Sequence, residues 1–287
     1  MDEMKIFTPQ DVSNYYDETE SHFRIWWKMN TSMGLHYGIW EKGIKSFSDA
    51  ILNTNSILLK MGEIKESDLV LDAGCGVGGS AIFLAKNLGC KVTGITLSEK
   101  QTGTASTFAE QHGVSHLVSF HAMDYTKTSF PNNTFDVVWA VESMQTAVDK
   151  LDFFKEVKRI LKPGGRVVIA DWFKSYDYPL KEKKSMQMMN NYWAITDVLS
   201  VNEFSTKAVM ENFLLVKNRD VTKQVAPSVR RLFIAAYFGM YVSFYYNIFV
   251  KKTGYFSRNH YKTGLAQLIA YYKKLWTYNL LILRVEK

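Results

Sequence analysis

The chain has 287 residues, of which 47% are hydrophobic, so it can bury a full core as one α/β domain with insertions or as two domains. Its two cysteines, Cys75 and Cys90, exclude a disulfide framework and a C-x-x-C metal site, and no metal is expected. The net charge of +7 is uneven: residues 217–287 hold 13 basic and 2 acidic residues, hence +11, which leaves −4 elsewhere. A basic segment of this kind is either a solvated face or the neighbour of an anionic membrane, phosphorylated substrate or nucleic acid.

The N-terminal region, residues 1–60, is predicted to be helical and rich in aromatic side chains. The first five residues lack the basic and apolar parts of a signal peptide, so we expect a cytoplasmic protein, with membrane association left open. The aromatic residues of this region are Tyr15, Tyr16, Phe23, Trp26, Trp27, Tyr37 and Trp40.

Between residues 61 and 172, short apolar runs alternate with helical segments. The first run, 68–72, ends at a glycine cluster, as a buried parallel strand does at a ligand-binding edge. This alternation predicts βαβ units and a parallel sheet that binds its ligand at the carboxyl ends of the strands. Further strands are predicted at 91–95, 117–121, 135–139 and 166–170, and helices at 80–88, 98–111 (with Ser98 as N-cap and Gln101 at the capping-box spacing) and 149–161.

After residue 172 the alternation stops. We expect two helical cap insertions over the carboxyl edge of the sheet, at 173–202 and at the aromatic-rich 226–275. The core is predicted to continue through 203–225 and to end in 276–287. Within these core segments we predict a helix at 203–211 and strands at 213–220 and 278–284.

One segment, Leu232–Val250, has 19 residues without a formal charge between two pairs of basic residues. That length can cross a bilayer. Its tyrosine, serine and asparagine side chains are costly in hydrocarbon, so a buried helix is favoured, with shallow interfacial contact left open. Its aromatic side chains either pack in the core or form a wall around an apolar substrate. The aromatic series is Tyr237, Phe238, Tyr241, Phe244, Tyr245 and Phe249.

The glycine cluster after the first strand reads Asp-Ala-Gly-Cys-Gly-Val-Gly-Gly over residues 72–79. Gly74 and Gly76 allow a tight strand-to-helix turn and a close approach of the backbone to a ligand. A dinucleotide site needs G-x-G-x-x-G and a carboxylate about 20 residues later. Here the second strand ends at Thr96 and no acid follows until Glu99, so a nicotinamide cofactor is disfavoured.

Four segments in order resemble the motifs of class I S-adenosylmethionine-dependent methyltransferases. They are residues 71–79, Met123–Tyr125, 130–138 and 160–165, and together they span most of 68–170. The resemblance implies an enzyme whose cofactor is S-adenosyl-L-methionine. It also implies a Rossmann-like sheet of seven strands, mostly parallel with the last one antiparallel, that carries helical cap insertions.

Finer features resemble a small-molecule subgroup. Residues 92–101, with Thr-Leu-Ser and Gln101 in place of a ribose-binding acid, look like cyclopropane fatty acid synthases and tocopherol methyltransferases. Residues 220–228 resemble the tocopherol and sterol type. Residues 15–17 and 34–40 resemble the N-terminal region of the same group, whose tyrosines would close over the methionine end of the cofactor. The implied cofactor-binding residues are Tyr16, Asp72, Ala73, Gly74, Gly76, Thr96, Leu97, Gln101, Met123, Asp124, Tyr125 and Val141.

Within this resemblance, Asp72, Gly74 and Gly76 would hold the methionine part of the cofactor, while Thr96 and Gln101 would meet the ribose hydroxyls. Asp124 would contact the adenine amine.

The acceptor is predicted to be a hydrophobic or amphipathic small molecule, such as an isoprenoid, lipid or prenylated ring. Residues 142–150 lack the histidine base of many related O-methyltransferases, so C-methylation is favoured. The candidate catalytic residues are Glu142, His36 and Tyr37. Alternatives are an O- or N-methyltransferase of a natural product, or a cofactor-binding partner subunit without activity. No nucleic-acid partner is expected, while peripheral membrane contact and a homo-oligomer stay open.

Overall fold

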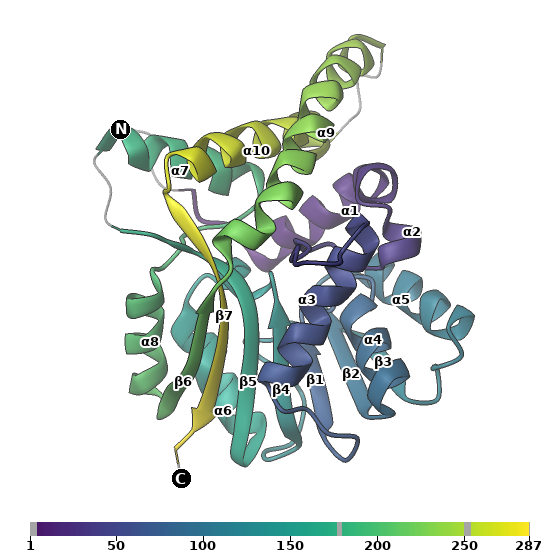
Figure 1. The fold of residues 1–287 in the computed structure, drawn as a ribbon, viewed down its shortest axis with the longest axis vertical. Coiled ribbons are helices and arrows are strands. Elements are labelled where there is room, and N and C mark those ends of the chain that lie inside the picture. Colours follow the sequence, from purple (N-terminus) through teal and green to yellow (C-terminus); the bar gives the residue numbers. More distant parts are fainter. Residues whose placement is uncertain (1–4, 177–179, 250–253, 287) are drawn as a thin grey trace.

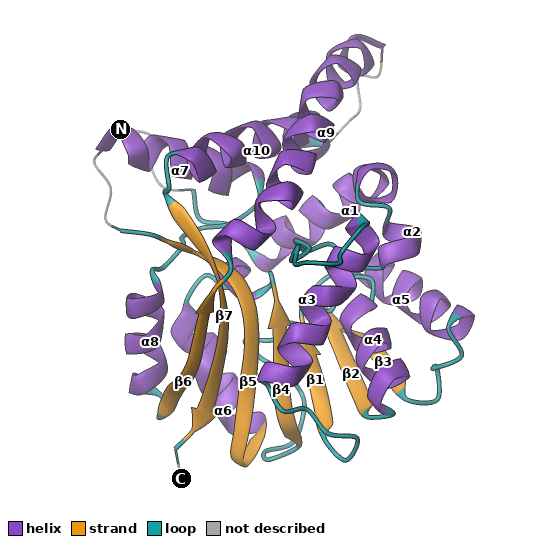
Figure 2. Cartoon of the chain, in the orientation of Figure 1, coloured by secondary structure: helices purple, strands orange, loops and turns teal. Residues whose placement is uncertain are grey.

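The computed structural model describes residues 5–176, 180–249 and 254–286. Its strands form a seven-stranded sheet in the order β3-β2-β1-β4-β5-β7-β6, with helices on both faces (Figures 1 and 2). The seven predicted strands are all present, and several extend beyond the predicted bounds. The strands are β1 (Leu69–Ala73), β2 (Lys91–Thr96), β3 (Val118–Ala122), β4 (Phe135–Val141), β5 (Leu161–Lys174), β6 (Phe213–Asp220) and β7 (Trp276–Val285).

The pairing of the strands confirms the predicted sheet. β3, β2, β1, β4 and β5 pair in parallel, while β7 lies antiparallel between β5 and β6. The strand order reverses between β1 and β4, so the loops after these two strands diverge at the carboxyl edge. Such a divergence leaves a crevice at the edge of an open α/β sheet, which is where ligands bind in such folds.

Successive strand residues supply two different cores, because side chains alternate between the faces of a strand. On β5, Val168 joins the core under the N-terminal helices, while Val167 and Ile169 join the core on the other face. The flanking helices are α3 (Phe47–Met61), α4 (Gly79–Leu88) and α5 (Glu99–Gln111) on the first face, and α6 (Lys150–Ile160) and α8 (Val201–Met210) on the second.

The remaining helices lie beyond the carboxyl ends of the central strands (Figure 1). Helix α9 rises from the end of β6, and its far end projects away from the sheet. These helices are α1 (Pro9–Trp26), α2 (Met29–Ser32), α7 (Leu180–Tyr192), α9 (Thr222–Phe249) and α10 (Tyr255–Tyr272), with a 3-10 turn, η1 (Met144–Thr146), directly after β4.

The first predicted insertion, 173–202, is helical only in part. Strand β5 runs on to Lys174, because its antiparallel partner β7 starts as early as Trp276 and pairs with it there. Helix α7 covers 180–192, and the chain from residue 194 to 200 is irregular. The following helix starts two residues earlier than predicted, since Ser200 and Glu203 form a capping box around its first turn.

The N-terminus of α5 departs from the predicted capping box in one respect. The Ser98 hydroxyl accepts the backbone N–H of Gln101, as an N-cap residue should. The Gln101 side chain does not return to Ser98, because its Oε1 accepts the hydroxyl of Thr96 at 2.6 Å instead. Of the two hydrogen bonds of a capping box, only the one from the Gln101 backbone to Ser98 is therefore present, and the Gln101 side chain contributes to the crevice instead.

The aromatic part of α9 is neither buried nor part of a substrate wall, where the structure describes its side chains. Tyr237, Phe238 and Tyr241 are exposed to solvent, so the burial predicted for this segment is wrong at these positions. The side chains of Phe244, Tyr245 and Phe249 lie outside the described ones. Among the helices that the structure describes, none is long and apolar enough to span a membrane.

The N-terminal loop packs so closely on α3 that it requires a glycine at position 38. A Cβ there would lie 2.5 Å from the Ala50 Cβ and 2.9 Å from the backbone nitrogen of Ile51. We expect Gly38→Ala to lower the free energy of unfolding by about 1–3 kcal/mol, because backbone atoms must move. Gly103→Ala is the matched control, since its Cβ on α5 meets nothing within 4 Å and should stabilise the helix by about 0.5–1 kcal/mol. Urea denaturation checks both values, and equal effects would contradict this packing.

Candidate active site

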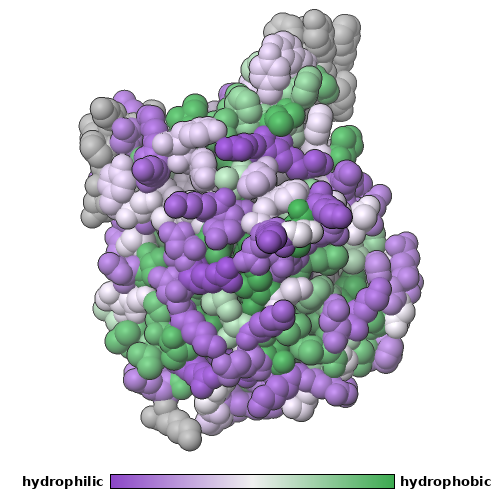
Figure 3. Space-filling model, viewed as in Figure 1, coloured by the Kyte–Doolittle hydropathy of each residue, from purple (hydrophilic) through white to green (hydrophobic). Residues whose placement is uncertain are grey.

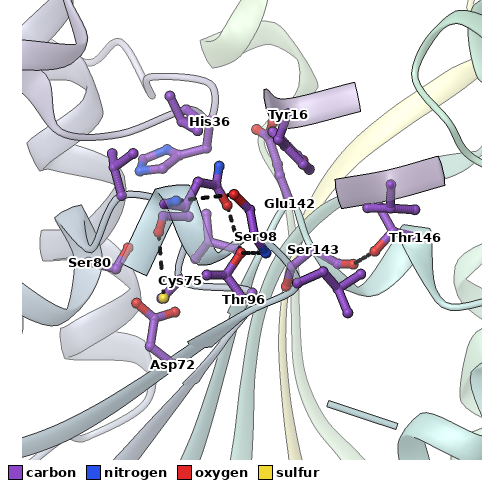
Figure 4. A pocket seen from close by; sticks show the side chains of 18 of the residues that line it. Tyr16, His36, Asp72, Cys75, Ser80, Thr96, Ser98, Glu142, Ser143 and Thr146 are labelled. Carbon is purple, nitrogen blue, oxygen red and sulfur yellow. Dashed lines mark hydrogen bonds between the residues drawn. The ribbon is translucent and has the colours of Figure 1, made fainter. Parts of the chain in front are cut away.

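A cavity of about 1070 Å³, part of it open to solvent, lies at the carboxyl ends of β1, β2 and β4 (Figure 4). Helix α1 and the loop before α3 form its outer wall, with side chains from residues 12 to 36. The cavity brings together most of the predicted site residues: Tyr16, His36, Asp72, Gly74, Gly76, Thr96, Leu97, Gln101, Met123, Tyr125, Val141 and Glu142.

The glycine loop forms the floor of this cavity. Gly74 and Gly76 have φ values of +87° and +52°, a backbone conformation that favours glycine. A Cβ at Gly74 would overlap the side chain of Ser143, in the loop that follows β4. The glycines thus let the loops after β1 and β4 approach each other at the point where the strand order reverses.

Asp72 is the one charged residue of β1, and beside the cavity it has a carboxylate oxygen without a hydrogen-bond partner among the described residues. Its Oδ2 is buried and has no hydrogen-bond partner in the described chain, although the residue lines the cavity. Burial raises the pKa of Asp72 to about 7. A buried acceptor without a donor is costly, so the position fits a ligand that brings a positively charged donor.

A polar cluster at the end of β2 is already ordered by hydrogen bonds. Because Thr96 donates to Gln101 Oε1, the amide nitrogen of Gln101 is left as a donor. The Ser98 hydroxyl donates to the carboxylate of Asp17 on α1, in a short hydrogen bond. Lys100 also forms an ion pair of 2.7 Å with Glu20 of α1. The outer wall is therefore tied to the segment that would hold a ribose.

Two predicted cofactor-binding residues lie outside the main cavity. Ala73 is buried behind its wall, where its carbonyl accepts the Ser143 hydroxyl at 2.5 Å. Asp124 lines a smaller adjoining cavity that shares Leu97 with the main one. Its Oδ1 accepts the backbone N–H and the hydroxyl of Thr126 at 2.8 and 2.7 Å. The side chain is therefore held firmly at the edge of the site.

Glu142 follows β4 in a conformation that non-glycine residues seldom adopt, with φ of +48°. Its Oε1 accepts the backbone N–H of Tyr37 at 2.6 Å and the hydroxyl of Tyr278 at 2.7 Å. Both donors use the same oxygen, so Oε2 makes no hydrogen bond within the described residues. Burial raises the pKa of Glu142 to about 7 despite these two donors.

A second carboxyl group reinforces the acidic character of this region. Asp171 on β5 is fully buried, and its Oδ2 has no hydrogen-bond partner in the described chain. Burial and, after it, the nearby Glu142 raise the pKa of Asp171 well above its usual range. Asp171 was not among the predicted site residues, because an aspartate inside an apolar strand carries no motif.

The other two candidate catalytic residues differ in position. His36 lines the cavity, its Nδ1–H donates to the carbonyl of Tyr37 at 2.9 Å, and its Nε2 is buried without a hydrogen-bond partner in the described chain. Burial lowers its pKa to about 4, so the imidazole is neutral near pH 7. The Tyr37 ring stacks on Trp276, 6.2 Å away, behind the cavity wall, and Tyr15 is likewise buried outside it.

Several lining residues carry no motif and were missed by sequence reasoning. Trp172 at the end of β5 and Trp193 after α7 stack with ring centroids 5.5 Å apart on the cavity wall. Gln145 donates to the Trp172 carbonyl at 2.6 Å. The only signal that could have pointed to Trp193 is its place in a predicted cap insertion. Other missed lining residues include Val12, Ser143 and Ile195.

Residues 71–169, about a third of the chain, match a family described as a methyltransferase domain. The chain carries a class I methyltransferase domain. A sterol 24-C-methyltransferase of Gibberella zeae is 32% identical over 192 residues, which cover 65% of this chain and 50% of that protein. A 2-methyl-6-phytyl-1,4-hydroquinone methyltransferase of Synechocystis is 34% identical over 203 residues, 68% of this chain and 62% of that protein. The chain thus spans about half to three fifths of the length of these relatives.

Among solved structures, a cyclopropane synthase of Mycobacterium tuberculosis has the same fold. Its TM-score is 0.79 over 99% of this chain and 100% of that chain, at 15% sequence identity. At this identity the likeness concerns the fold alone. The predicted fold class and the predicted S-adenosylmethionine-dependent methyltransferase family are confirmed for this domain, with S-adenosylmethionine as its cofactor.

The raised pKa of Glu142 makes a pH-dependent contribution to stability. The folded protein holds this proton with a pKa of about 7, whereas the usual value is 4.5, so ionisation between these values costs folding free energy. The stability of the wild type relative to Glu142→Gln should therefore fall as pH rises from 4.5 to 7, by on the order of 2 kcal/mol. Urea denaturation across this range measures it, with exposed Glu66→Gln as control. A difference that does not change with pH would contradict the assignment.

Proposed function

We propose that this chain transfers the methyl group of S-adenosylmethionine to a carbon atom of a hydrophobic or amphipathic acceptor of the isoprenoid, lipid or prenylated-ring class. The observation that carries the proposal is Glu142, a half-buried carboxyl group on the cavity wall whose Oε1 accepts two hydrogen bonds, whose Oε2 accepts none within the described residues, and whose pKa is about 7. Methylation of an alkene or ring carbon leaves a cation that must lose a proton. A carboxyl group with a pKa near the working pH suits that step.

The floor of the cavity fits the cofactor. Asp72 Oδ2 is a buried acceptor without a donor, and the amino group of the methionine part is a donor of positive charge. Gly74 and Gly76 leave room for a close approach of the backbone, and the Gln101 amide nitrogen can donate to a ribose hydroxyl. The cofactor, once bound, supplies an activated methyl group on a positively charged sulfur. The protein residues mainly position the two reactants, an effect that can be worth about 7–11 kcal/mol.

The upper part of the cavity favours an acceptor without a formal charge. The lining includes the aromatic side chains of Phe23, Trp172 and Trp193, a residue type that can stabilise positive charge by cation–π attraction. Among the described residues that line it, none is a lysine or arginine. The basic C-terminal segment therefore gives no support to a diphosphate-bearing acceptor.

The relatives support the same class of acceptor. The name of the Gibberella protein specifies carbon 24 of a sterol, and that of the Synechocystis protein a phytyl hydroquinone. Both are lipophilic molecules built wholly or partly from isoprenoid units. Because the chain spans only 50% and 62% of these proteins, the acceptor of this chain is part of the proposal.

An oxygen or nitrogen acceptor is the second candidate, and His36 favours it. The unpartnered Nε2 of this neutral histidine can accept a hydrogen bond from a hydroxyl or amine and so orient it. With a pKa of about 4, the imidazole is a weak base, so it would position the acceptor rather than remove its proton. The atom that receives the methyl group separates the two candidates.

The direct test is transfer of a ¹³C-labelled methyl group to a sterol, a prenylated hydroquinone and an unsaturated phospholipid, with NMR of the product. We expect a new carbon–carbon bond, and Glu142→Gln should lower kcat by about 10²–10⁴-fold with unchanged affinity for S-adenosylhomocysteine, whose sulfur is neutral. The exposed Glu66→Gln is the control. Label on oxygen or nitrogen would select the second candidate. Cofactor binding without turnover on all three acceptors would favour the inactive partner subunit.

Asp72 is expected to control cofactor affinity. Asp72→Asn keeps the shape of the side chain but removes its charge, so S-adenosylhomocysteine should bind about 10- to 100-fold more weakly, the loss expected for a charge-assisted hydrogen bond. Isothermal titration calorimetry measures this affinity. Asp49→Asn, on the exposed surface of α3, should leave the affinity unchanged. Equal affinity of wild type and Asp72→Asn would remove Asp72 from the cofactor site.

A further inference from the structure

An apolar ridge of exposed side chains runs along α9 and continues onto the end of α1. On α9, Phe238 and Val242 expose 53% and 65% of their surfaces, and on α1 Ile25 exposes 68%. Trp26 of α1 stacks on Phe238, with ring centroids 6.5 Å apart and planes within 8° of parallel, so the two helices present one surface. The ridge consists of Ile25, Trp26, Ile234, Tyr237, Phe238, Tyr241 and Val242.

The ridge stands where α9 leaves the body of the molecule. Figure 1 shows α9 projecting beyond the other helices, and Figure 3 shows hydrophobic side chains gathered where it emerges. Arg231 holds the base of the projection, because its guanidinium donates to the Trp26 carbonyl and lies 4.7 Å from the Phe47 ring centre. The apolar surface is therefore anchored to the domain.

The part of the chain that contains α9 is strongly basic in sequence, and two exposed basic residues lie close to the ridge residues along the chain. Residues 221–285 contain no aspartate or glutamate, while they contain ten lysines and arginines. Arg230, one helical turn before Ile234, is exposed, as is Lys28, two residues after Trp26. Neither side chain forms an ion pair or hydrogen bond within the described part of the chain.

We propose that the ridge docks this protein onto the surface of an anionic lipid bilayer. Tyrosine and tryptophan favour the interface between headgroups and acyl chains, and apolar side chains between them enter its outer edge. Each basic residue near an anionic surface adds about a fivefold gain in binding. The charge argues against a second copy of this chain on the ridge, because two such surfaces would repel.

Docking would also place the active-site wall next to the bilayer. Helix α1 contributes Tyr16 and Phe23 to the cavity and Ile25 and Trp26 to the ridge, so one helix would face both the membrane and the acceptor. A lipophilic acceptor could then pass from the bilayer to the site without crossing water. This step alone rests on the proposed function, whereas bilayer binding itself does not.

The test is co-sedimentation of the full chain with vesicles of phosphatidylcholine alone and of phosphatidylcholine mixed with phosphatidylglycerol. We expect binding to the anionic vesicles that weakens with added salt, and little binding to the neutral ones. The double variant Phe238→Ser/Val242→Ser should weaken binding by roughly tenfold or more. Arg230→Gln should weaken it about fivefold.

Matched controls distinguish binding through the ridge from nonspecific binding by other exposed apolar side chains and from the effect of net charge. Val209 and Met210 of α8 are as exposed as the ridge residues, at 61% and 66%, so Val209→Ser/Met210→Ser should bind like the wild type. Lys86→Gln on α4 controls for the loss of one charge. Equal binding to both vesicle types, or equal losses in the control variants, would overturn the proposal.

Two more readouts complete the test. Light scattering should show the same mass for the wild type and the ridge variants. A wild-type dimer that Phe238→Ser/Val242→Ser converts to a monomer would assign the ridge to a second copy of the chain and so overturn bilayer docking. Methyl transfer to a detergent-dispersed acceptor should be unchanged in the ridge variants. A failure of methyl transfer in the wild type would count against the proposed function and not against vesicle binding.

Discussion

The carboxyl group of Glu142 joins three parts of the chain that are far apart in sequence. It stands at the end of β4, accepts the backbone N–H of Tyr37 from the N-terminal loop, and accepts the hydroxyl of Tyr278 from the last strand. Removing most of the solvent from a carboxyl group and holding its backbone at a positive φ both cost free energy, and the two donors on Oε1 offset only part of that cost. The pKa of Glu142 is raised because the free-energy cost of desolvating its ionised form exceeds the stabilisation from the two donors. The same residue thus fixes the N-terminal loop over the sheet and presents its free oxygen to the cavity.

The outer wall of the cavity depends on a set of polar contacts made by α1. Asp17 accepts the hydroxyl of Ser98, and Glu20 pairs with Lys100, which ties α1 to the start of α5. On its other side, Glu18 accepts the backbone N–H groups of Phe256 and Ser257, so it caps the N-terminus of α10. Helix α1 is therefore held between the start of α5, beside β2, and the N-terminus of α10. A wall fixed in this way limits the access of water to the site, which favours methyl transfer over hydrolysis.

The sheet and the glycine loop could be predicted from sequence, whereas the walls above them could not. Short apolar strands and the run of residues 72–79 depend on local patterns, and the structure has all seven strands. The position of Trp193 depends on how an irregular segment after α7 folds back onto β5, and no periodicity encodes that. The exposure of Phe238 was missed for a related reason: an apolar helix has the same sequence whether it faces the core or an external partner. The role of Tyr37 could not be predicted either, because its backbone N–H, which any residue could supply, contacts Glu142 while its ring stacks on Trp276.

The electrostatics of the cavity favour a cationic ligand. Asp72 and Glu142 line the cavity and have raised pKa values, and among the described lining residues none is a lysine or arginine. A ligand that carries positive charge stabilises the ionised form of each nearby carboxyl group and so lowers its pKa. Binding of the methyl donor must then release protons near pH 7, and by linkage its affinity must rise with pH across that range. After transfer the sulfur is neutral and this attraction weakens, so the same buried charges that draw in the donor favour release of the spent cofactor.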